Sequence, residues 1–63
     1  MALEYFIART ARNLVEHHGA DAIAQARSHL AECRARDEAF AADAWMRIVG
    51  AVEALLVENA RAS

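Results

Sequence analysis

The chain has 63 residues, with seven arginines, no lysine, nine acidic residues and a net charge of −2. A net negative charge without a basic run lacks the electrostatic footprint of proteins that bind nucleic acids or anionic membranes. A chain this short forms one domain with a small core, and it has little room for a deep enclosed pocket.

The first predicted helix covers residues 2–18. Its buried stripe recurs at spacings of three and four residues and comprises Leu3, Phe6, Ile7, Thr10, Leu14 and His17 or His18. Gly19 follows directly, and glycine adopts the positive φ that often ends a helix without steric cost. We therefore expect the helix to stop at Gly19.

The second predicted helix covers residues 21–36. Asp21 lies where an acidic side chain can accept hydrogen bonds from the free N–H groups of a first helical turn. The stripe of this helix comprises Ala22, Ile23, Ala26, Leu30 and Cys33.

The third predicted helix covers residues 39–60 and has the clearest apolar pattern. Its stripe comprises Trp45, Ile48, Val49, Val52, Leu55 and Leu56 and is about 120° wide. Residues 34–38 interrupt the pattern before it, and Asp37 is a candidate cap for the third helix. However, this segment has no glycine or proline, and the apolar phase resumes at Phe40 and Ala44. One long second helix therefore remains an alternative.

Together these elements predict an all-α fold, a small three-helix domain covering residues 1–63. The alternative is a helical hairpin with one long second helix. The chain has no proline and is rich in alanine, leucine, glutamate and arginine, all of which favour helix.

The expected compartment is the cytoplasm. Cys33 is the single cysteine, which cannot form an intrachain disulfide and suits a reducing environment. The longest apolar run, 48–57, is interrupted by Glu53 and is shorter than the roughly 20 residues of a membrane span. The first residues include Glu4 and no basic leader, so we expect no secretion signal and no membrane association.

Two segments carry a resemblance. The run Leu14-Val15-Glu16-His17-His18-Gly19-Ala20-Asp21-Ala22 and the run Ala44-Trp45-Met46-Arg47-Ile48 resemble a group of short alphaproteobacterial helical proteins without an assigned function. That group has a helix ending in His-Gly, an alanine-rich second helix, and a Gly-Asp turn before a tryptophan helix. Here Asp37-Glu38 stands at the turn. The resemblance implies a helical, cytoplasmic, bacterial protein, and it brings no activity or site residue.

The histidines and the cysteine raise the question of a metal site. His29 and Cys33 are four residues apart on one helix face, a spacing that can hold two ligands of Zn²⁺. In an antiparallel hairpin around Gly19, His29 would lie about 15 Å from His18. Adjacent His17 and His18 point about 100° apart. We therefore expect no metal and no cofactor, with Cys33 as a small core residue. A metal-binding helical protein, with His29 and Cys33 as the candidate ligands, is a further alternative.

Catalysis and DNA binding have little support. The sequence has no glycine-rich phosphate loop and no His-Glu-x-x-His motif, so we expect no enzyme. A helix-turn-helix regulator is the alternative function, because arginines at 9, 12, 27, 34 and 36 lie on the first two helices. Glu16 and Glu32 lie on the same helices, and no helix begins with the polar cluster of a recognition helix.

A protein interaction is the favoured function. Two surfaces of small or apolar residues lie outside the predicted stripes. On the second helix they are Ala24, Ser28, Ala31 and Ala35, and on the third helix they are Met46, Gly50 and Val57. Trp45 is a further interface candidate, although as a large aromatic it also suits the core. The expected partner is a second copy, giving a homodimer or higher oligomer, or another protein.

Overall fold

The computed structural model describes residues 2–62, and residues 1 and 63 of the predicted domain lie outside them. The all-α prediction is confirmed for this part of the chain, which contains no strand. Helix α1 covers Ala2–His18, the 3₁₀ turn η1 covers Gly19–Asp21, α2 covers Ala22–Ala35 and α3 covers Ala39–Ala62. Because α1, η1 and α2 follow one another without an extended residue, they form one long, bent helical path that leads to α3.

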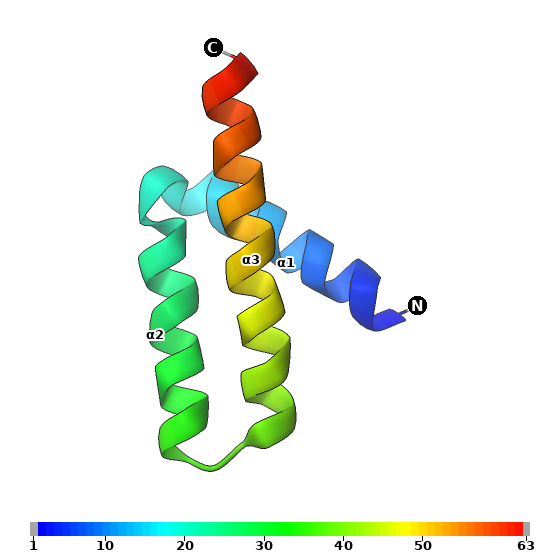
Figure 1. Cartoon of the computed structure of the whole chain (residues 1–63), viewed down its shortest axis with the longest axis vertical. Helices are drawn as coiled ribbons and strands as arrows, with labels where there is room; N and C mark the ends of the chain where they lie inside the picture. Colours follow the sequence, from blue (N-terminus) through cyan, green and yellow to red (C-terminus); the bar gives the residue numbers. More distant parts are fainter. Residues whose placement is uncertain (1, 63) are drawn as a thin grey trace.

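The helices form an antiparallel hairpin with one crossing helix. Figure 1 shows α2 and α3 side by side, while α1 crosses α3 on one side of the hairpin and its N-terminal end points away. The molecule measures 39 × 26 × 15 Å and has a radius of gyration of 11.7 Å. A compact domain of 63 residues has a radius of about 10.6 Å. The fold is therefore thin and open.

The bend between α1 and α2 is at Gly19. Its φ of +56° confirms the predicted positive-φ residue at the end of the first helix. The predicted capping by Asp21 is wrong. Asp21 precedes α2, but its backbone is already helical, at φ −76° and ψ −6°, and its side chain makes no capping hydrogen bond. The 3₁₀ turn leads directly into α2, so the carboxylate is not used there.

The turn between α2 and α3 is built on Asp37. The Glu38 N–H donates to the Cys33 carbonyl at 2.9 Å, and the Asp37 N–H donates to the Arg34 carbonyl at 3.2 Å. These two bonds, with Asp37 at φ +57°, form the Schellman motif that ends many helices. Asp37 therefore ends α2 and does not cap α3, which corrects the sequence-based expectation. The single long second helix is not formed.

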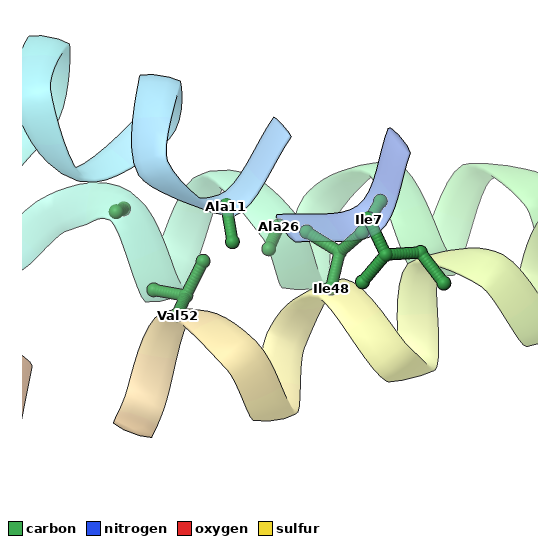
Figure 2. Close-up of a cluster of buried hydrophobic side chains, with 6 residues drawn as sticks. Ile7, Ala11, Ala26, Ile48 and Val52 are labelled. Carbon is green, nitrogen blue, oxygen red and sulfur yellow. The ribbon is translucent and has the colours of Figure 1, made fainter. Parts of the chain in front are cut away.

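The core lies where α1 crosses the hairpin (Figure 2). Its members are Ile7, Ala11, Ala22, Ala26, Ile48 and Val52. Of the large side chains, only Ile48 and Val52 are fully buried within residues 2–62. The other members are Ile7 and three alanines, and partly buried leucine, isoleucine, valine and tryptophan side chains pack around them. The core is therefore small even for a chain of this length.

Two aromatic residues are exposed although the sequence pattern predicts otherwise: Phe6 belongs to the predicted stripe of the first helix, and Phe40 is where the apolar phase resumes. Phe6 is 53% exposed and Phe40 is 79% exposed. On α1 the buried line runs through Ile7 and Ala11, which differ by about 40° around the helix, whereas Phe6 is about 100° from Ile7. Ile7 and Ala11 are the buried residues of α1 in the described part of the chain, and Leu3, Leu14 and Val15 are partly buried against the core. Phe40 lies in the first turn of α3, away from the crossing.

Candidate functional site

His29 and Cys33, the two candidate metal ligands, lie in different surroundings. Cys33 is buried, whereas His29 is exposed and its ring stacks on Trp45 with centroids 4.4 Å apart. Its Nδ1 atom is 4.0 Å from a carboxylate oxygen of Glu32. Within residues 2–62 no group of three His, Cys, Asp or Glu side chains gathers around one point. In the described part of the chain, His29, Glu32 and Cys33 therefore do not form a set of three converging ligands.

The adjacent histidines lie apart from that pair. His17 and His18 occupy the last turn of α1, and both are exposed. A positive charge there would favourably oppose the partial negative charge of the helix C-terminus. Their position fits a helix-end feature.

The small residues of α2 all lie on the surface. Ala24, Ser28, Ala31 and Ala35 are exposed, on the side of α2 away from its buried residues. Those buried residues are Ala22, Ala26 and Cys33. This line has no large apolar side chain, so it has little apolar area to offer a partner.

The apolar candidates of α3, which are Met46, Gly50 and Val57, form together with the exposed Ala54 what we call the outer face. Met46 is 52% exposed, Val57 is 54% exposed, and the two small residues between them are also exposed. Met46, Gly50 and Val57 lie about 160–180° around the helix from the fully buried Ile48. The outer face therefore points away from the core.

Gly50 has no role inside the chain. A Cβ atom built on Gly50 meets nothing within 4 Å. Glycine inside a helix costs roughly 1 kcal/mol relative to alanine. The packing within the chain therefore does not require a glycine at position 50. A close approach of another backbone from outside the chain would require one.

Trp45 lies on a different side of α3 from the outer face. It is partly buried, packs against the core cluster and stacks on His29. The structure thus places Trp45 between α2 and α3, where it fills space beside the core.

A shallow groove between α1 and α3 had no signal in the sequence. It has a volume of about 280 Å³, and its lining comprises Ala8, Ala11, Arg12, Ala51, Ala54, Leu55 and Glu58. Small-molecule sites combine an enclosed apolar cavity with several converging polar groups. This groove offers only Arg12 and Glu58, from two different helices, so it has no evident catalytic arrangement.

The arginines do not form one basic surface. Arg27 pairs with Glu53 at 3.3 Å, and Arg47 pairs with Asp43 at 3.2 Å. Each of these two arginines therefore has an acidic side chain beside it. Of the remaining candidates, Arg9 and Arg12 lie on α1, whereas Arg34 is in the last turn of α2 and Arg36 directly follows that helix.

The chain exposes more surface than expected for its size. Its accessible area is 4603 Å². A folded monomer of this mass exposes about 4000 Å², so the excess is about 600 Å². The exposed large apolar side chains are Tyr5, Phe6, Phe40, Met46 and Val57.

Comparisons with protein-family models, curated proteins and solved structures found no match. Within residues 2–62, no helix combines the length and the apolar character needed to cross a bilayer. The outer face of α3, with its exposed apolar side chains and its unexplained glycine, is the best-supported candidate site.

Proposed function

We propose that this chain is a small, non-enzymatic interaction protein that self-associates through apolar helix surface. The proposal treats the molecule as a unit of three helical segments acting in the bacterial cytoplasm. The observation that carries it is the imbalance between interior and surface. Only Ile48 and Val52 are fully buried large side chains, whereas five large apolar side chains are exposed in the described part of the chain.

Energetics support this reading. Fully burying a valine, leucine or isoleucine side chain contributes about 1.5–3 kcal/mol, so two such residues supply little stability. The large exposed side chains would contribute further burial free energy if a partner covered them. The excess surface of about 600 Å² approaches the about 800 Å² per partner of a standard protein interface.

Sedimentation or light scattering over protein concentrations of about 1–500 µM tests the proposal. We expect the average mass to rise above the 6.9 kDa of one chain, and the melting temperature to rise with concentration. A constant mass of 6.9 kDa together with a high, concentration-independent melting temperature would overturn it.

The same samples test the alternative of a DNA-binding regulator. Phosphate binding by arginines would retard mixed-sequence DNA at low salt and fade steeply as salt rises. We expect no retardation, because Arg27 and Arg47 are paired with carboxylates and the net charge is negative. Salt-sensitive retardation would favour the regulator.

A further inference from the structure

We propose that two copies of this chain exchange helix α1, so that α1 of each copy packs on the α2–α3 hairpin of the other. This inference rests on the proposed self-association and names the surface that the two copies share. The hinge is the segment Gly19–Asp21. When the hinge opens, α1 and α2 become one continuous helix of residues 2–35.

The hairpin already presents a surface that fits α1. Ile7 and Ala11 of α1 belong to one core cluster with Ala26, Ile48 and Val52 of the hairpin. An α1 from a second copy would make the same contacts, because both chains have the same sequence. The exchange of an identical element therefore needs no new complementary surface, and it is a low-cost route to a dimer.

The hairpin has specific contacts of its own that do not involve α1. The Arg27 guanidinium of α2 pairs with the Glu53 carboxylate of α3 at 3.3 Å, and the His29 ring of α2 stacks on Trp45 of α3. These contacts join α2 to α3 whether or not α1 of the same chain is in place. The chain therefore divides into α1 and the hairpin, connected at residues 19–21 (Figure 1).

Gly19 is the residue that bends the helical path between α1 and α2. Its φ is +56°, whereas Asp21 and Ala22 already have right-handed helical backbone angles. Neither His18 nor Asp21 makes a side-chain capping hydrogen bond at the bend. In a continuous helix the free N–H and C=O groups of the two helix ends would bond to each other. The bend is therefore a place where the chain can straighten with a gain of backbone hydrogen bonds.

A continuous helix would keep its buried residues on one side. Ala11 and Ala22 are both fully buried and are eleven residues apart, which corresponds to about 20° around a helix. Ala26 lies about 40° further round. The apolar side of α1 thus continues onto the apolar side of α2. The open chain would present one apolar stripe that a second open chain can cover.

Gly19→Ala tests the hinge. Alanine disfavours the left-handed conformation of the bent form and favours the helical conformation of the open form. The effect comes from φ alone, because a Cβ atom at Gly19 meets nothing within 4 Å. A dimer contains two hinges. We therefore expect the dissociation constant to fall by about ten-fold for each hinge and about a hundred-fold in total, as measured by sedimentation or light scattering.

Gly19→Asn is the matched control for this change. Asparagine adds a side chain at the same position but adopts the left-handed conformation more readily than alanine does. The dissociation constant of Gly19→Asn should therefore fall by no more than about ten-fold in total. Equal dissociation constants for the two variants would show that the conformation of Gly19 does not control association, and the hinge would be wrong.

The distance between α1 and the end of α2 distinguishes helix exchange from other dimers. Spin labels at Tyr5→Cys and Ala35→Cys, both exposed positions, report this distance in a Cys33→Ala background. In a continuous helix these positions are about 45 Å apart, which exceeds the 39 Å length of the whole bent molecule. Dilution with unlabelled chains restricts the measurement to one chain. We expect about 45 Å in the Gly19→Ala dimer.

The parent sequence provides the same measurement without a hinge substitution. At about 500 µM a fraction of its labelled chains should show the long distance, and this fraction should disappear on dilution. A dimer whose labels stay within 39 Å would end the proposed exchange and leave the proposed self-association intact. A mass of 6.9 kDa at every concentration, for both the parent chain and Gly19→Ala, would end both proposals.

Discussion

The imidazole ring of His29 stacks on the indole ring of Trp45, with ring centroids 4.4 Å apart and 13° between the ring planes. This contact joins α2 to α3 beside the core, and it shields one side of the indole. Stacked aromatic pairs contribute about 0.5–1.5 kcal/mol beyond their area burial. The stack gives His29 a role in holding the hairpin together that needs no metal ion.

Replacing His29 tests that role. His29→Ala should lower the free energy of unfolding by about 0.5–1 kcal/mol and shift the fluorescence of Trp45 to longer wavelength, because the indole becomes more hydrated. Urea unfolding followed by fluorescence measures both effects. Gln25→Ala, one helical turn earlier on the exposed surface of α2, is the control and should leave the emission unchanged. Identical spectra for His29→Ala and the parent chain would contradict the stack.

Replacing Asp37 by glycine should change the stability of the fold, and the backbone conformation gives the direction of the change. Its φ of +57° is in the left-handed region, which costs L-residues other than glycine about 1–2 kcal/mol, less for aspartate and asparagine. Glycine removes this cost but loses more entropy on folding. Asp37→Gly should therefore stabilise the chain by about 0.5–1 kcal/mol, which corresponds to a melting temperature several degrees higher.

The neighbouring residue provides the control for this change. Glu38 does not have a positive φ, so Glu38→Gly should lower the melting temperature through backbone entropy alone. If both glycine variants lower the melting temperature, the turn does not contain the left-handed residue described above.

The alanines of the helix crossing set the third prediction. Ala26 is fully buried and Ala24, two residues away on the same helix, is exposed. Ala26→Leu should destabilise the chain by about 1–3 kcal/mol, because a larger side chain forces the helices apart. Ala24→Leu should change stability by less than about 0.5 kcal/mol. Thermal melts at low protein concentration compare the two, and equal effects would mean that Ala26 is not at a close contact.

Ile48 sets the fourth prediction. A chain of this length has a total stability of about 3–9 kcal/mol. Ile48→Ala, which removes the larger fully buried side chain, should cost about 2–5 kcal/mol and leave the chain partly unfolded at 25 °C. Ile48→Val should cost only about 0.5–1.5 kcal/mol. Far-UV circular dichroism measures the loss of helix. Full helicity in Ile48→Ala would contradict the described core.

Helical periodicity was sufficient to predict the interior of the hairpin. Ala26 and Cys33 on α2, and Ile48 and Val52 on α3, are buried as their spacing indicated. Where α2 and α3 run side by side (Figure 1), a stripe at spacings of three and four residues faces the neighbouring helix, so its central members are covered. The positive φ of Gly19 was predictable because it depends on a local steric rule for the residue that follows a helix.

The crossing helix was not predictable in the same way. Periodicity shows which side of a helix is apolar, but it does not give the angle at which the helix meets its neighbours. Ala11 is fully buried and Phe6 is half exposed because α1 turns the side of Ile7 and Ala11 towards the hairpin, and Phe6 lies about 100° from Ile7 around the helix. The role of Asp37 was also hidden, because aspartate is typical both of helix starts and of left-handed turns.

The candidate site was predicted in part. Met46, Gly50 and Val57 share one side of α3 by spacing alone, but whether the chain covers that side depends on where α1 and α2 pack. Only the structure shows that a Cβ at Gly50 would meet open space. The groove beside Ala51 required two helices to be placed relative to each other, which no local pattern supplies.

Ala11, Ala22 and Ala26 are fully buried members of the core cluster, and their small methyl groups set how closely the helices pack there. The interior can therefore gain almost nothing from bulkier residues, and natural variation has few ways to make the isolated fold sturdier from within. Most of the freedom to change lies on the exterior, so a descendant could acquire new binding preferences while keeping the same scaffold.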